Sequence, residues 1–180
     1  AGADLSGADL AGADLRDCIL VGAKTFSWNV TEANMVGVLT DKPAGRAVED
    51  LPHKEMIRDH ARWCETGGAE GRPSVFDRAD LRNLKSIRGY NLTALSARGA
   101  VFYGLDMEGV QLQGAHLEGA DLRGCNLRRA DLRGARLAGA KLSGSDLRDA
   151  TLGPLLFAAD RLLTCDLTGA QLKATDFSRA

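Results

Sequence analysis

Aromatic residues are scarce in this chain, and long apolar runs are missing. Phe, Trp and Tyr make up 5% of the 180 residues, although hydrophobic residues as a whole reach 44%. A core of that composition consists mainly of Leu and Ala, so we expect it to be thin and repetitive rather than built around large rings. No apolar run is long enough to cross a bilayer and no leader segment is present, so we expect no membrane attachment.

The sequence also lacks a start Met. Its first residue, Ala1, already belongs to a repeat. We therefore expect a fragment or a trimmed product, and the missing targeting signals carry little weight.

An excess of charge of either sign is missing as well. The sequence has 23 Lys and Arg residues against 24 Asp and Glu residues. A protein that binds nucleic acid usually presents a basic stripe, which is not apparent here. A protein that imitates nucleic acid needs a sustained acidic surface. The balance of charges makes nucleic acid an unlikely partner, and it gives no support to a protein that imitates nucleic acid.

What the chain does have is a five-residue rhythm. From Ile87 to Phe177 an apolar residue stands at every fifth position, nineteen times in succession, and thirteen of these residues are Leu. A small residue stands two positions before most of them, as in Ala120-Asp121-Leu122. A helix would carry this period around its axis, since five residues advance about 500°, and a flat strand would alternate its faces. The chain must therefore turn a corner every five residues and return to one interior, as solenoids do.

The rhythm begins at the first residues, with Leu5, Leu10, Leu15 and Leu20, and it fails over residues 41–73. Within this segment apolar residues recur at helical spacing, which predicts an amphipathic helix over about 51–66 with Gly67-Gly68 ending it. We expect this helix to cap an exposed solenoid end. The expected organisation is a first repeat segment over 1–40, a linker and capping helix over 41–73, and a second repeat segment over 74–180.

Besides residues 41–73, three places depart from the rhythm. Trp28 takes a small interior slot, where it either ends the regular stacking or turns outward in a bulge. The register slips by one residue near Leu84. Gly153-Pro154 interrupts a corner, and we expect a distorted coil over 153–161 with Asp160 turned outward. Phe157 and Phe177 are twenty residues apart, so we expect them to stack inside the C-terminal end.

The sequence has four cysteines, and three of them stand in the small slot of the repeat: Cys18, Cys125 and Cys165. A free Cys often serves as a small buried hydrophobe. With four repeats to a coil, Cys125 and Cys165 should lie in one column two coils apart, roughly 9–10 Å. That separation is too long for a disulfide, so a reducing cytoplasm is the simplest compartment.

Runs such as Ala3-Asp4-Leu5-Ser6-Gly7 and Ala130-Asp131-Leu132-Arg133-Gly134 resemble the A(D/N)LXX unit of the pentapeptide-repeat family. The resemblance covers about 1–40 and 74–180. It implies an all-β solenoid, a right-handed quadrilateral β-helix with Leu and Ala pointing inward, here in two repeat segments interrupted by the amphipathic α-helix. Residues 60–68 also resemble helices that precede repeat runs in bacterial members of the family.

Some members of this family bind DNA gyrase by imitating duplex DNA, so a DNA-mimicking gyrase or topoisomerase binder of the quinolone-resistance type is the alternative function. Asp106, Asn126, Asp146 and Asp166 are expected to form an outward column that such a mimic could use. Arg128 and Arg148 are expected to stack beside that column, which argues against mimicry.

The residues otherwise offer little chemistry. His60 and Cys64 have a spacing that can hold zinc, but no second ligand pair is present and both lie on the apolar face, so we expect no metal. No catalytic set or phosphate-binding loop is apparent, so we expect neither enzymatic activity nor a cofactor.

We expect a non-enzymatic protein-interaction or scaffold module with an unidentified protein partner. The candidate protein-binding residues are Trp28, Trp63, Arg128 and Arg148, and a homodimer through a solenoid end is a second mode of association.

Overall fold

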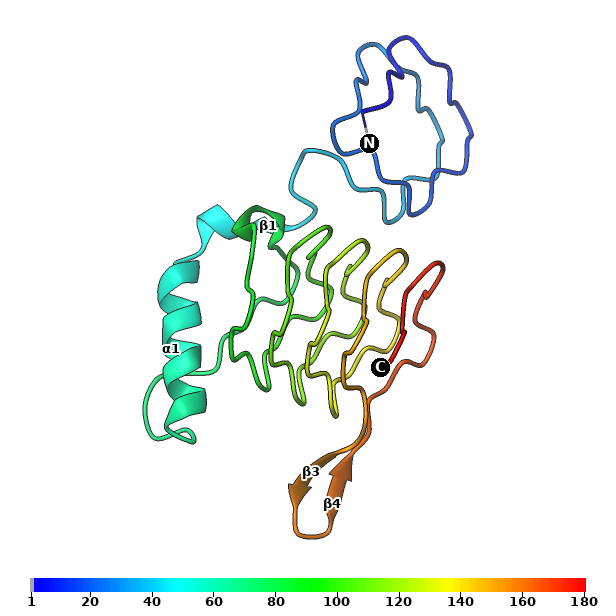
Figure 1. Ribbon diagram of the computed structural model, residues 1–180. Helices are drawn as coiled ribbons and strands as arrows, with labels where there is room; N and C mark the ends of the chain where they lie inside the picture. The colour runs from blue at the N-terminus through cyan, green and yellow to red at the C-terminus, as the bar shows by residue number, and fades with distance from the viewer. Residues whose placement is uncertain (1) are drawn as a thin grey trace. The chain divides into compact units, whose positions relative to one another are not determined.

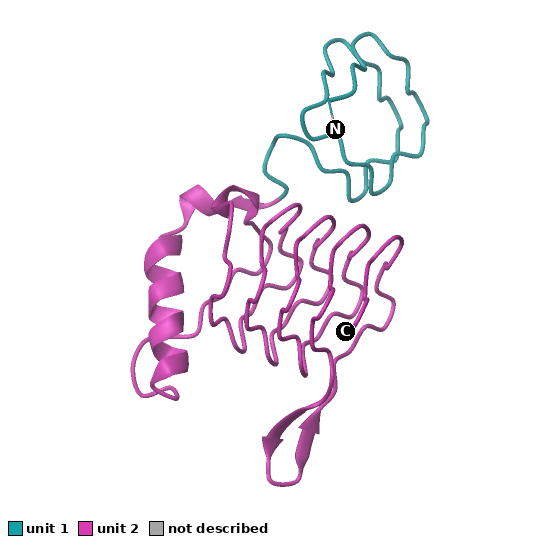
Figure 2. Cartoon of the chain, viewed as in Figure 1, with its two compact units in different colours: residues 1–44 teal, residues 45–180 magenta. Residues whose placement is uncertain are grey.

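The computed structural model describes residues 2–180, which separate into two compact units, residues 1–44 (unit 1) and 45–180 (unit 2) (Figures 1 and 2). In both units the chain winds in coils that are joined by parallel backbone bridges between residues of successive coils. Extended pairing within residues 2–180 is limited to two two-stranded sheets, β1–β2 and β3–β4. The repeat therefore forms stacked coils held mainly by single bridges.

Unit 1 contains two coils in a constant register. Its four bridges join residues twenty apart: Asp4 to Lys24, Asp9 to Asn29, Asp14 to Asn34, and Ile19 to Leu39. The bridge beside Trp28 is intact, because the Asn29 N–H donates to the Ala8 carbonyl at 2.8 Å. Regular stacking therefore continues past Trp28 as far as Leu39.

Unit 2 begins with a cap. Strand β1 (Arg46–Ala47) pairs in parallel with β2 (Ala79–Asp80), and a 3₁₀ turn η1 (Val48–Asp50) leads to helix α1 (His53–Glu65). The helix lies within the range predicted from its apolar spacing, and it ends where the Gly68 N–H donates to the Trp63 carbonyl at 2.8 Å. Val48, Leu51, Met56 and Ile57 pack with the core of the coils. The segment thus covers the first coils of unit 2, the position expected of a cap.

The slip near Leu84 is a 3₁₀ turn. Turn η2 (Arg82–Leu84) is followed by Lys85 at φ +64°. Bridge partners before this turn are twenty-one residues apart, as in Asp80 to Val101, and those after it are twenty apart, as in Ser86 to Asp106. One extra residue is therefore absorbed at one corner.

The core of unit 2 is the inward column of Leu and Ala that the rhythm predicts. Leu112, Leu117, Leu122 and Leu127 are fully buried, and Ala115, Ala120 and Ala130 fill the small slots between them. Cys125 takes one of these small slots, where burial raises the pKa of its thiol to about 12. All four cysteines are free.

A hairpin near the C-terminal end changes the register. Strands β3 (Leu155–Ala158) and β4 (Arg161–Leu163) form an antiparallel pair, and beyond them bridge partners are thirty residues apart. The predicted stacking of Phe157 on Phe177 is wrong for this reason. Phe157 lies in the hairpin, and Phe177 lies below Leu147, whose N–H donates to the Asp176 carbonyl.

The same shift corrects two predicted columns. Asp166 pairs with Arg136, so it does not belong to the column of Asp106, Asn126 and Asp146, which continues to Asp176. Cys165 precedes Asp166 and therefore follows Ala135, in a different column from Cys125. The distortion expected over 153–161 is present, and Asp160 is exposed at the hairpin turn.

Among residues 2–180, no helix has both the length and the apolar character needed to cross a bilayer.

Candidate protein-interaction site

The β3–β4 hairpin is an apolar projection that carries three of the exposed large hydrophobic side chains of unit 2. It extends away from the stacked coils of unit 2 (Figure 1). Leu156, Phe157 and Leu162 retain 64%, 66% and 62% of their surface exposed. Large apolar side chains that cluster on an exposed element mark an interaction site more often than scattered ones do.

The strand pairing shows how the hairpin is attached to the coils. Leu155 pairs with Leu163 at its root, and Leu156 pairs with Leu162 one step further out. Neighbouring residues of a strand point to opposite faces, and the pairing is irregular between Leu156 and Ala158. Near the turn the Arg161 guanidinium lies 6.0 Å from the centre of the Phe157 ring. The root residues are partly buried, and the three outer residues are left to solvent.

Gly134 is the seat of this root. A Cβ atom on Gly134 would lie 2.9 Å from the Cβ atoms of both Leu155 and Leu163. Beside it, where β4 meets the coils, is an open cavity of about 440 Å³ lined by Glu118, Gly134, Arg136, Leu162, Leu163, Thr164 and Asp166. The hairpin therefore stands on a coil that leaves room for it.

Substitution of Gly134 tests this seat. Gly134→Ala should loosen the hairpin root, because the new methyl group meets two Leu side chains and because Gly134 has φ +65°. Gly139→Ala is the matched control, since its φ is +68° and no atom lies within 4 Å of its Cβ position. Both variants carry the left-handed penalty of about 1–2 kcal/mol. Faster cleavage by chymotrypsin at Phe157 in Gly134→Ala alone is the expected result, and equal cleavage of both would contradict it.

The two Trp residues predicted as anchors lie in different surroundings. Trp28 is partly buried in unit 1 and lines a cavity of about 300 Å³ with Leu20, Ala23, Thr25, Thr40, Asp41 and Lys42. Trp63 is partly buried on α1, its ring 5.8 Å from that of His60 and its Nε1 close to Gly68. Each therefore packs within its own unit.

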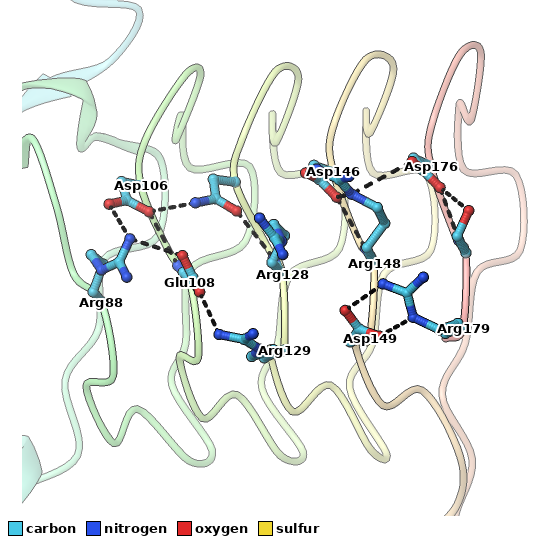
Figure 3. Close-up of polar contacts among 12 residues, drawn as sticks. Arg88, Asp106, Glu108, Arg128, Arg129, Asp146, Arg148, Asp149, Asp176 and Arg179 are labelled. Atoms are coloured by element: carbon cyan, nitrogen blue, oxygen red, sulfur yellow. Dashed lines mark hydrogen bonds and ion pairs between the residues drawn. The ribbon is translucent and has the colours of Figure 1, made fainter.

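Arg128 and Arg148 lie on one face of unit 2, whose bridge residues are Ser86, Asp106, Asn126, Asp146 and Asp176; we call it the charged face (Figure 3). Arg148 pairs with Asp146 at 2.5 Å and with Asp176 at 3.6 Å. Arg128 has a buried Nε without a hydrogen-bond partner among the described residues. The structure thus brings both Arg residues to the column where they were expected.

Ion pairs run along the whole charged face. Figure 3 labels five acidic and five basic side chains on this face. Four ion pairs among them join successive coils: Arg88–Glu108, Arg129–Glu108, Arg148–Asp176 and Arg179–Asp149. Hydrogen bonds from Arg148 hold the pKa of Asp146 below its usual value, and those from Arg179 do the same for Asp149. Solvent-exposed pairs contribute little stability each. The ten labelled charges balance, five negative against five positive, so the face carries no sustained negative charge.

Three corners of the charged face carry a cost. Arg129, Asp149 and Arg179 have φ of +56°, +60° and +59°, where most corners of unit 2 have Gly. Side chains at such positions strain the backbone, and each of these three takes part in an ion pair. Two of the four cross-coil pairs, Arg129–Glu108 and Arg179–Asp149, therefore use corners whose backbone disfavours a side chain.

His60 and Cys64, whose spacing can hold zinc, both lie against backbone groups of unit 2. Both ring nitrogens of His60 are within hydrogen-bond distance of backbone groups, and the Cys64 thiol lies 3.8 Å from the Thr93 carbonyl. No group of three or more candidate ligands occurs within residues 2–180. The apolar face of α1 packs against the coils, as its sequence predicted.

Comparison with known proteins gives a family for the repeats. The model for pentapeptide repeats matches eight copies over residues 1–24 and 111–149. No curated protein matches the chain.

Three solved structures illustrate the likeness. A pentapeptide repeat protein, Rfr23, from the cyanobacterium Cyanothece 51142 is 25% identical over 52% of this chain and 60% of its own, with a TM-score of 0.30. HetL from Nostoc sp. strain PCC 7120, a pentapeptide repeat protein involved in heterocyst differentiation regulation, is 21% identical over 97% and 83%, with a TM-score of 0.35. Full-length QnrB1, a plasmid-mediated fluoroquinolone resistance protein, is 16% identical over 98% and 80%, with a TM-score of 0.27.

The chain spans about three fifths of the first of these structures, and the low TM-scores carry no argument about function. The match of the repeats confirms the family that the sequence resembles: this chain carries pentapeptide repeats in both of its units.

Proposed function

We propose that the chain is a non-enzymatic protein-interaction or scaffold module, and that the β3–β4 hairpin is its principal contact. The observation that supports this proposal is the exposure of Leu156, Phe157 and Leu162 on one short projection. Solvent-exposed apolar side chains of this size gain most when a partner removes them from water, at about 25 cal/mol per Å². The partner we propose is a folded protein with an apolar groove that accepts the hairpin.

The stacked coils serve in this proposal as a rigid support for the hairpin. We infer that they form the right-handed quadrilateral β-helix typical of the family, which the four bridge positions in each twenty-residue coil support. Because Leu155 and Leu163 are seated over Gly134, the outer side chains are presented in a defined position. Presentation on a rigid element lowers the entropy lost on binding.

Binding measurements on matched variants test the proposal. Capture from the native cell identifies a partner, which is then purified and titrated against wild type and against a triple variant with Leu156→Ser, Phe157→Ser and Leu162→Ser. Apolar anchors at the centre of an interface often contribute about 2 kcal/mol each, so the additive loss of three anchors should raise Kd by about 10⁴-fold.

Phe26→Ser is the control, because Phe26 is 81% exposed on unit 1 and resembles Phe157 in chemistry. It should leave Kd unchanged. Equal affinity of the triple variant and the wild type would reject the hairpin as the contact. Trp28→Ala and Trp63→Ala in the same titration test the two anchors expected from the sequence, and sedimentation at increasing concentration tests a homodimer through a solenoid end.

The DNA-mimic alternative gains no support from the charged face. Its carboxylates are interleaved with Arg side chains, whereas a phosphate mimic needs sustained negative charge. A gyrase supercoiling assay with and without a quinolone separates the two functions. Inhibition or protection at stoichiometric concentration would favour the alternative over the scaffold proposal.

A further inference from the structure

His60 joins three parts of unit 2. It lies on the inner side of α1 with none of its surface exposed. The Ser74 N–H donates to Nδ1 at 2.8 Å, and Nε2 lies 3.1 Å from the Thr93 carbonyl. The ring thus connects α1, the start of the repeats at Ser74 and the last corner of the first coil at Thr93.

These partners determine the protonation of the ring. Nδ1 must accept a hydrogen bond, because its partner is a backbone N–H. Nε2 must therefore carry the proton and donate it to the Thr93 carbonyl, as a neutral imidazole does. A second proton on Nδ1 would point at the Ser74 N–H and leave that buried donor without an acceptor, which is costly.

Among residues 2–180, no carboxylate pairs with the His60 ring, whose two nitrogens face backbone groups. Of the groups around His60 on α1 and on the segment that follows it, Asp59 pairs with Arg72 at 3.4 Å and Arg62 pairs with Glu70 at 2.5 Å. The remaining neighbours are uncharged: the Trp63 ring, the Cys64 thiol, and the Thr93 hydroxyl with its partners Asn91 and Gln113. Burial lowers the pKa of His60, and the Thr93 carbonyl opposes this only in part.

We propose that His60 is a pH-sensitive latch, whose protonation releases α1 from the first coils of unit 2. Release would remove Met56 and Ile57 from the core and open the apolar end that they cover. The latch is independent of the hairpin, and it gives the cap a second, open state in which the end of the coils can meet a partner.

The direction of the pH dependence follows from the lowered pKa. The released state binds a proton near the ordinary His value of about 6.5, whereas the docked state resists protonation. Docking is therefore at full strength above pH ~6.5 and weakens as the pH falls below that value, by about tenfold per pH unit until the docked-state pKa is reached.

Hydrogen exchange of the α1 amides measures the docking. With intrinsic exchange rates corrected for, the protection factors of residues 56–64 should fall by about tenfold per pH unit below pH ~6.5. Protection that stays constant between pH 7.5 and 5 would overturn the latch.

His60→Gln is the decisive variant. A Gln carboxamide can accept from the Ser74 N–H and donate to the Thr93 carbonyl, yet it does not titrate. Its α1 protection should be independent of pH. His53→Gln, in the first turn of the same helix, is the matched control and should keep the wild-type pH dependence.

A direct titration keeps the proposal falsifiable if His60→Gln does not dock. The ring resonances of His60 in the wild-type protein should titrate below pH ~6.5, together with the change in protection. A titration at or above that value would overturn the latch whatever the variants show.

Discussion

Phe102→Ala should lower the free energy of unfolding of unit 2 by about 3–5 kcal/mol. Phe102 has none of its surface exposed and stands in the large slot of the repeat, where most coils have Leu. Truncation removes its transfer free energy and leaves a cavity. Because each coil is bridged to its neighbours, as at the 2.8 Å bond from the Phe102 N–H to the Asp121 carbonyl, the coil cannot collapse freely to fill it.

Phe157→Ala is the control, since it makes the same chemical change on the exposed hairpin. It should alter the unfolding free energy by no more than about 0.5 kcal/mol. Urea unfolding with a common m value measures both. Similar losses in the two variants would contradict the prediction, because the exposed hairpin would then contribute as much stability as the inner column.

Gly71→Ala should have the second-largest effect, because it disrupts the turn that returns the chain from α1 to the repeats. A Cβ on Gly71 would collide with the Asp59 carbonyl oxygen and lie 2.8 Å from the Trp63 backbone nitrogen, and the residue has φ +76°. Overpacking costs about 1–3 kcal/mol and a side chain in this backbone region about 1–2 kcal/mol, so the total loss should be about 2–5 kcal/mol.

Gly67→Ala separates these contributions. Gly67 lies in the same turn at φ +60°, and no atom lies within 4 Å of its Cβ position. It should therefore show only the backbone cost of about 1–2 kcal/mol. Trp63 fluorescence in a Trp28→Phe background reports on this turn during unfolding. Equal losses at the two positions would show that the contact with α1 is unimportant.

The period predicted the interior of the coils well, because only residues that return to the same place every five positions can form one core. Leu122 and Ala120 are buried for that reason. For the irregular places, the sequence predicted where the rhythm breaks but not which backbone structure forms there. The slip at Leu84 could be counted in the sequence, whereas the 3₁₀ turn that absorbs it depends on the backbone of Lys85.

The hairpin was harder to see, because its length is a multiple of the period. Phe157 and Leu162 keep the five-residue rhythm although neither lies in the core. The count that predicted a stack with Phe177 could not distinguish a coil from a ten-residue insertion, as the change from twenty to thirty between bridge partners reveals. Similarly, the helical spacing placed His60 on the inner face, but its two backbone partners come from segments whose approach no local pattern encodes.

The hairpin also shows where this scaffold tolerates change. Beyond Thr151 the chain leaves the stack, and it rejoins it at Asp166 with its bridges restored, so the coils keep their pairing around the inserted residues. Loop closure costs little for added length. A foreign peptide grafted in place of residues 156–162, which keeps Leu155 and Leu163 over Gly134, should therefore be displayed without disturbing the coils.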